Sequence, residues 1–255
     1  MTYSSGYYRR NDMSLEASQT AKYDRICELA NLQVGEHVLE VGCGWGGFAE
    51  LAAGKHRCNV TGLTLSHEQH AYAHRRLLMQ GLNDRTEIVL RDYRHQEGQF
   101  DKIVSIEMFE AVGEEHWPTY FEMIRRCLKP GGKAVLQIIT IDDDRFDTYR
   151  KGADFIQRYI FPGGMLPSPT ALAGAVTNAG LYLQHSEFFG KSYARTLAEW
   201  QRSFQHAWDG IAKQGFDLRF KRMWEYYLAY CETGFDQGSI DVGLFVIEHR
   251  ENATG

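Results

Sequence analysis

Apolar and polar positions follow two different patterns along the first part of the chain, one typical of strands and one typical of helices. Between residues 14 and 141, short apolar runs typical of buried strands alternate with stretches whose apolar residues recur at helical spacing. The runs lie at 38–41, 58–65, 86–93, 101–108 and 133–141, and the helical stretches at 14–32, 48–55, 67–80 and 117–128. Strands that alternate with helices favour a parallel sheet with helices on both faces.

The rhythm changes after residue 142. The pattern predicts a helix over 144–158, an ordered loop over 159–169, a helix over 170–180, a strand over 181–188, helices over 193–213 and 216–233, and a last strand over 239–250. The two later strands bring the total to seven. We therefore predict an α/β fold with a mostly parallel, seven-stranded sheet.

Charge and aromatic content sharpen this picture. The 255 residues include 28 Lys and Arg against 33 Asp and Glu, a net charge of −5, which argues against a protein built to bind nucleic acid. Of the 33 aromatic residues, 13 lie in residues 1–145 and 20 in residues 146–255. The later part of the chain is therefore unusually aromatic.

The cysteines and the apolar runs bear on the cellular compartment. Five cysteines are scattered without a CxxC pair, which indicates free thiols in a reducing compartment. We see no signal peptide and no apolar run of 18 residues. We expect a cytoplasmic protein whose only membrane contact is peripheral, on the inner face.

A glycine-rich turn follows the first predicted strand. Gly42, Gly44 and Gly47 fit the GxGxxG pattern of turns that let a nucleotide approach the backbone. Dinucleotide sites place an acidic residue at the end of the second strand, but residues 62–66 (GLTLS) contain none. Glu40 precedes the glycines instead, an arrangement typical of S-adenosylmethionine methyltransferases.

Longer segments are more selective than this turn. They read YSSGYY (3–8), VLEVGCGWGG (38–47), GLTLSHEQ (62–69), RDYR (91–94), FDKIVSIEMFEAVG (100–113), YFEMIRRCLKPGG (120–132), YIFPGGMLPS (159–168), FGKSYARTLAEW (189–200) and RMWEYYLAYC (222–231). On these segments the chain resembles the cyclopropane-fatty-acyl-phospholipid synthase family, which includes the mycolic acid cyclopropane synthases. It matches the short form, without the extra N-terminal domain of the longer bacterial synthases.

The resemblance implies a Rossmann-like class I methyltransferase fold with a helical substrate-binding cap. Residues 1–255 are expected to form a single domain, with a cofactor-closing segment (1–13), a cofactor-binding core (14–141), substrate-binding insertions (142–235) and a final strand and tail (236–255). The implied reaction modifies the double bond of an unsaturated fatty acyl chain of a phospholipid, giving a cyclopropane or methyl-branched product. The aromatic excess falls where the family builds its acyl pocket.

The resemblance also implies S-adenosyl-L-methionine as cofactor and a set of residues that bind it. They are Glu40, Gly42, Cys43 and Gly44 at the methionine part, Thr64, Leu65 and Gln69 at the ribose and adenine, Asp92 and Tyr93 beside the adenine ring, and Tyr3 and Ser4 as a cover. No metal is implied.

A catalytic site is implied as well. In the family a bicarbonate ion acts as the base and is held by a Cys, a Glu, a His and a Tyr. Glu110 and Tyr227 match the Glu and the Tyr, whereas Ser5 stands at the Cys position and Gln137 at the His position. Because Ser and Gln still donate hydrogen bonds, bicarbonate remains one candidate for the base.

Two further departures suggest a different base. Glu107 replaces the family's Gly, and Ala111 replaces its His. Glu107 and Glu110 lie three residues apart and form a candidate carboxylate pair. Two close carboxylates raise one pKa, which makes that group a usable acid or base at neutral pH. The sequence leaves the choice between bicarbonate and this pair open.

Particular residues bear on other functions and partners. SIEMFE (105–110) also resembles coclaurine-type N-methyltransferases, but these use a Glu-Glu-His set and Ala111 lacks the His. A relative without catalytic activity is disfavoured by Glu110 and Tyr227. Arg219, Lys221 and Arg222 fit either a contact with lipid phosphates or a solvated face. The sequence is also compatible with a homo-oligomer.

Overall fold

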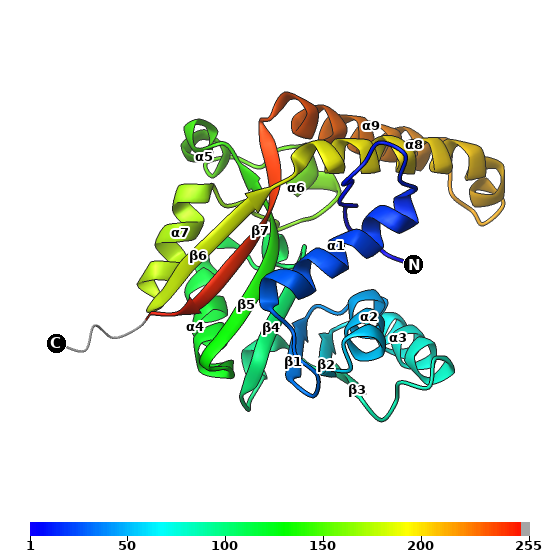
Figure 1. Cartoon of the computed structure of the whole chain (residues 1–255). Helices are drawn as coiled ribbons and strands as arrows, with labels where there is room; N and C mark the ends of the chain where they lie inside the picture. The colour runs from blue at the N-terminus through cyan, green and yellow to red at the C-terminus, as the bar shows by residue number, and fades with distance from the viewer. Residues whose placement is uncertain (251–255) are drawn as a thin grey trace.

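The central element of the structure, a computed structural model that describes residues 1–250, is a seven-stranded sheet (Figure 1). Its strands are β1 (His37–Val41), β2 (Asn59–Thr64), β3 (Thr86–Leu90), β4 (Phe100–Ile106), β5 (Leu128–Ile141), β6 (Leu181–Phe188) and β7 (Ile240–His249). Their order in the sheet is β3-β2-β1-β4-β5-β7-β6, and β7 runs antiparallel to both its neighbours. The predicted mostly parallel α/β fold is confirmed.

Helices connect and cover the strands. They are α1 (Leu15–Ala30), α2 (Gly47–Lys55), α3 (His67–Met79), α4 (Trp117–Cys127), α5 (Asp143–Tyr149), α6 (Phe155–Tyr159), α7 (Pro169–Asn178), α8 (Gly190–Ala212) and α9 (Leu218–Gln237). The local sequence determines where three of these helices begin. Three serines at helix N-termini accept a hydrogen bond from the backbone N–H of the residue three positions later: Ser14 (α1), Ser66 (α3) and Ser168 (α7). Such N-caps satisfy amide groups that have no partner inside the helix.

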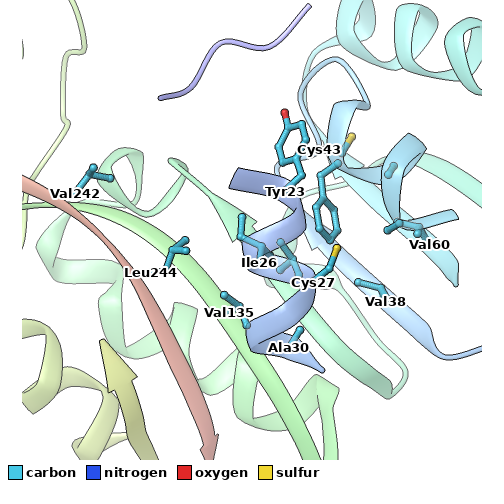
Figure 2. Close-up of a cluster of buried hydrophobic side chains, with 14 of the residues drawn as sticks. Tyr23, Ile26, Cys27, Ala30, Val38, Cys43, Val60, Val135, Val242 and Leu244 are labelled. Carbon is cyan, nitrogen blue, oxygen red and sulfur yellow. The ribbon is translucent and has the colours of Figure 1, made fainter. Parts of the chain in front are cut away.

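The core lies on both faces of the sheet, because successive strand residues point to opposite sides. Val38 of β1 belongs to the cluster under α1 and α2, and its neighbour Leu39 to the cluster under α4 and α7. Figure 2 shows Ile26 and Ala30 of α1 gathered with Val135 of β5 in the first cluster. The sheet is therefore buried on both faces, as the near-continuous apolar runs predicted.

Two predicted elements have different limits in the structure. The helix predicted over 144–158 is wrong, because it is broken into α5 and α6. Asp154 starts α6 in a capping box with Gln157, so the chain begins a new helix there. Residues 129–132 belong to β5 instead of a loop before it. Phe100 pairs with Leu128 and Lys102 with Lys133, so a bulge in β5 absorbs Pro130 and Gly131.

The segment 142–235, predicted as substrate-binding insertions, has two parts. It contributes α7 and β6 to the sheet layers, while α8 and α9 pack along each other and extend away from the sheet (Figure 1). The N-terminal segment crosses α8, where Gly6 N donates to Thr196 Oγ1 (2.9 Å) and Tyr8 N to Ser192 Oγ (3.1 Å). Across residues 1–250, no helix has the length and apolarity needed to cross a bilayer.

Candidate active site

The glycine turn joins β1 to α2 and is held against β2. Gly42 N and Cys43 N donate to the Leu63 carbonyl at 3.1 and 2.8 Å. Gly42 and Gly44 have φ values of +83° and +52°, which favour glycine. A Cβ at Gly42 would lie 2.9 Å from Met108 Cγ, whereas a Cβ at Gly44 would meet nothing within 4 Å. The backbone at Gly44 is therefore open to a ligand.

Glu40 lies at the end of β1 and is buried, with 3% of its surface exposed. Burial raises the pKa of its carboxyl group well above the usual value. Within residues 1–250, no hydrogen-bond donor reaches its Oε2. A buried acceptor beside an open glycine backbone suits a ligand that carries an ammonium group, as S-adenosylmethionine does. The residues thus fit the predicted cofactor.

The remaining cofactor positions gather at the same edge of the sheet. Thr64 Oγ1 donates to Gln69 Oε1 (2.8 Å), and Leu65 between them is exposed. Arg91 N donates to the Thr64 carbonyl (3.1 Å), so the chain beyond β3 returns to this edge. Asp92 follows there. These residues end neighbouring parallel strands, where α/β proteins bind nucleotides.

Asp92 and Tyr93 are held by their own surroundings. The Asp92 carboxylate accepts from Arg94 Nη2 at 2.6 Å, and this hydrogen bond lowers its pKa. The Tyr93 ring packs edge-on against Tyr120, with ring centroids 5.4 Å apart. Asp92 and Tyr93 follow Arg91, whose N–H donates to the Thr64 carbonyl, so both lie at the same sheet edge as Thr64. Their contacts with a cofactor remain predictions.

Ser4 contacts Lys22, a residue that the sequence analysis does not single out. Its hydroxyl accepts a hydrogen bond from Lys22 Nζ of α1, and the Lys22 side chain is fully buried. Burial lowers the pKa of Lys22 to about 8, and the charges of Glu107 and Glu40 oppose this shift. A signal existed: Lys22 lies four residues before the buried Ile26, on the apolar face of α1.

Three residues from distant parts of the chain meet at the Glu107 carboxylate. Its Oε1 accepts from Ser5 N (2.9 Å) and Gln137 Nε2 (2.5 Å), and its Oε2 from Tyr193 OH (2.6 Å). Gln137 Nε2 also donates to Ser5 Oγ (2.9 Å). Glu107 has a φ of +50°, a left-handed conformation that favours glycine. Three donors thus converge on one carboxylate.

The second carboxylate of the predicted pair lies next to this cluster. Glu110 Oε1 accepts from Ile139 N (2.6 Å), while its Oε2 receives no hydrogen bond from residues 1–250. Burial raises the pKa of Glu110 to about 8, and the nearby charge of Glu107 adds to the rise. At pH 7 Glu110 is therefore mainly protonated, and the pair does not carry two negative charges.

Two tyrosines of this region have different partners. Tyr193 contacts Glu107, although the sequence pattern singles out only the segment 189–200 and not this tyrosine. Tyr227, predicted for the site, has its hydroxyl 3.4 Å from that of Tyr3, and burial raises its pKa. The structure therefore brings Ser5, Glu107 and Gln137 together, and places Tyr227 next to Tyr3.

A cavity of about 1110 Å³ adjoins these groups. Glu107, Glu110, Tyr193 and Tyr227 line one part of it. Much of the rest of the wall is apolar and includes Ile139, Ile141, Ile156, Ile160, Phe161, Met165, Leu166, Leu197 and Phe235. Such a wall suits a long hydrocarbon chain, with the carboxylates as its polar part.

Three comparisons with known proteins bear on this site. A model of the mycolic acid cyclopropane synthetase family matches residues 1–245. The chain is 43% identical over 229 residues to tuberculostearic acid methyltransferase of Mycobacterium tuberculosis, covering 89% of this chain and 53% of that protein. It is 40% identical over 235 residues to cyclopropane-fatty-acyl-phospholipid synthase of Escherichia coli K12, covering 92% and 59%. The chain thus spans between half and two thirds of the length of these two relatives.

A solved structure gives a fuller overlap. A mycolic acid cyclopropane synthase in complex with SAH and CTAB superposes with a TM-score of 0.89 at 31% identity. The match covers 96% of this chain and 89% of that one. The similarity therefore extends over the strands and over the helices around the cavity.

Proposed function

This chain belongs to the mycolic acid cyclopropane synthetase family, and from that premise we propose that it is an S-adenosylmethionine-dependent C-methyltransferase. The proposed substrate is the double bond of an unsaturated fatty acyl chain in a phospholipid, and the product is a cyclopropane or a methyl-branched chain. The observation that carries the proposal is the large apolar cavity bordered by Glu107 and Glu110. Relatives named for tuberculostearic acid and for cyclopropane fatty acyl phospholipids support it.

The first task of the residues is to hold the cofactor. We assign this role to the eleven predicted positions: Tyr3, Ser4, Glu40, Gly42, Cys43, Gly44, Thr64, Leu65, Gln69, Asp92 and Tyr93. When bound there, S-adenosylmethionine supplies an electrophilic methyl group. Cys43 acts only as a wall, because burial raises the pKa of its thiol and makes it a poor nucleophile.

The second task is to stabilise positive charge on the substrate. An alkene is a weak nucleophile, and its attack on a methyl group leaves a carbocation on the neighbouring alkene carbon. The apolar cavity excludes water, which would otherwise capture this cation. The Glu107 carboxylate and the rings of Tyr193 and Tyr227 line the same cavity and are suited to stabilise the cation electrostatically.

The last task is to remove a proton, and here we propose Glu107 in place of bicarbonate. Its carboxylate lies against Ser5 and Gln137, the residues at the positions that hold the ion in the family. A C–H bond of the substrate breaks, its electron pair closes the ring or forms an alkene, and the proton moves to Glu107. Glu110, mainly protonated at pH 7, adds no second negative charge beside Glu107.

The alternative of a small amine substrate receives less support. Ala111, which replaces the His of the amine methyltransferases, lines the cavity and provides no base there. The cavity of about 1110 Å³ also exceeds what a small amine fills.

Expression in a bacterium rich in monounsaturated phospholipids, without a synthase of its own, tests the proposal. Mass spectrometry of the fatty acids should show chains that have gained one CH₂, and catalytic hydrogenation separates a ring from a branched alkene. The Glu107→Gln variant is the matched control and should leave the profile unchanged. An unmodified profile despite folded, cofactor-binding wild-type protein would refute the proposed reaction.

A further inference from the structure

A cluster of exposed aromatic side chains borders one part of the cavity wall. Tyr226 and Tyr230 of α9 stack with ring centroids 5.9 Å apart, and Phe155 of α6 packs edge-on against Tyr226 at 4.6 Å. Tyr159 packs against Phe155 at 5.3 Å. Tyr159, Phe161, Tyr226 and Tyr230 are between 43% and 59% exposed. So much exposed aromatic surface in one place indicates a binding face.

Four exposed basic residues lie on, or just before, the two helices that carry most of these rings. Arg158 follows Phe155 by three residues on α6, and Arg219 and Arg222 precede Tyr226 on α9 at spacings that place them on the same helix face. Lys151 lies just before α6. No ion pair within residues 1–250 engages any of the four, although the neighbouring Arg150 is paired with Glu114.

We call these eight residues the mouth face: Lys151, Arg158, Tyr159, Phe161, Arg219, Arg222, Tyr226 and Tyr230. Phe161, Tyr226 and Tyr230 both line the cavity and are exposed, so the cavity opens on this face. In Figure 1 the face lies where α6 meets α9, on the side of the sheet that carries the helical pair α8 and α9.

We propose that the mouth face binds the surface of a bilayer containing anionic phospholipids and so places the cavity opening where an acyl chain enters. The proposal rests on the proposed function, which makes a phospholipid chain the substrate. Tyrosines are enriched at membrane interfaces, and basic residues are attracted to anionic leaflets. Because the whole protein carries a net charge of −5, this attraction has to be local.

An acidic carrier protein is the other occupant that four cations could attract. The bilayer is favoured because four large aromatic side chains, two of them stacked, project from the same face. A bilayer accommodates such rings at the headgroup level, in addition to pairing with the charges. Asp154, which accepts a hydrogen bond from Tyr230 (3.4 Å), keeps its negative charge and offsets one of the four cations.

Co-sedimentation with vesicles tests the proposal. Vesicles of phosphatidylcholine alone are compared with vesicles that also contain phosphatidylglycerol, and wild type should prefer the latter. The Arg158→Glu/Arg222→Glu variant should bind the anionic vesicles at least about 30-fold more weakly, since it loses two cations at the surface and gains two carboxylates that the vesicles repel. The control, Arg75→Glu/Arg85→Glu, changes the net charge equally at exposed residues elsewhere and should bind like wild type.

A second pair of substitutions separates a bilayer from an acidic protein. Tyr159→Ser/Phe161→Ser removes aromatic side chains and no charge, and should weaken binding to both kinds of vesicle. If this variant binds like wild type, the face recognises charge alone and the bilayer proposal is wrong. Equal binding by the two Arg-to-Glu variants would also overturn it.

Turnover of an unsaturated lipid dispersed below its critical micelle concentration separates this proposal from the proposed function. The Arg158→Glu/Arg222→Glu variant should turn over this monomeric lipid at the wild-type rate while failing to bind vesicles. Wild-type protein that binds anionic vesicles through the mouth face but methylates no lipid would leave the face established and refute the enzyme function. Methylation without vesicle binding would refute the face alone.

Discussion

Replacing Glu107 with glycine separates the two candidates for the base. The variant loses the carboxylate but keeps its three donors, Ser5 N, Gln137 Nε2 and Tyr193 OH. Glycine suits the backbone there, because a φ of +50° costs a residue with a side chain about 1–2 kcal/mol. The fold should therefore survive with a small pocket that accepts a formate or bicarbonate ion.

The expected loss of activity follows from the role of a base. General-base catalysis contributes about 10²- to 10⁴-fold, so kcat of Glu107→Gly should fall by that factor in anion-free buffer. Added formate or bicarbonate should restore part of the rate. It should also raise the melting temperature, because an ion at 100 times its Kd stabilises the folded state by about 2.7 kcal/mol.

The assay measures methyl transfer from labelled cofactor to lipid, together with thermal unfolding, across a range of formate concentrations. Glu107→Gln is the control, because its amide fills the space without a charge and should be inactive with or without formate. The reasoning fails if Glu107→Gly keeps the wild-type rate without an added anion. It also fails if formate changes neither rate nor melting temperature while cofactor binding is intact.

The remaining predictions concern four neighbouring residues. The pKa of Glu110 is about 8 against an ordinary 4.5, so the free energy of unfolding should fall by about 5 kcal/mol as pH rises between these values. In urea unfolding, Glu110→Gln should therefore be more stable relative to wild type at pH 8.5 than at pH 4. The same stability difference at both pH values would contradict this. Lys22, with a pKa of about 8 against 10.5, has the opposite sign: stability rises with pH across that window by about 3 kcal/mol, and Lys22→Met should remove the rise in the same assay. Tyr193→Phe removes a hydrogen bond to a charged group and should lower kcat about 10- to 150-fold without changing cofactor affinity. Tyr227→Phe removes a hydroxyl whose one side-chain hydrogen bond within residues 1–250 is with Tyr3, so it is the control and should change kcat less.

The sequence predicted those features that depend on neighbours along the chain. The apolar runs predicted the seven strands, and the helical spacing over 14–32 predicted α1, because strand burial and helical periodicity are local signals. The glycine turn was placed correctly between β1 and α2 for the same reason. The missed break between α5 and α6 shows the limit, because the capping box of Asp154 and Gln157 competes with a continuous helical pattern.

The arrangement around Glu107 was decided only by the tertiary structure. The sequence named Ser5, Glu107 and Gln137 separately and left bicarbonate and a carboxylate pair as alternatives. Ser5 is 102 residues from Glu107, Gln137 is 30 and Tyr193 is 86, so only folding shows that their donors meet at one carboxylate. Side-chain direction at such distances depends on how strands and helices pack, and no local pattern encodes it. The same packing brings α6 to α9, and with them the aromatic and basic residues of the mouth face.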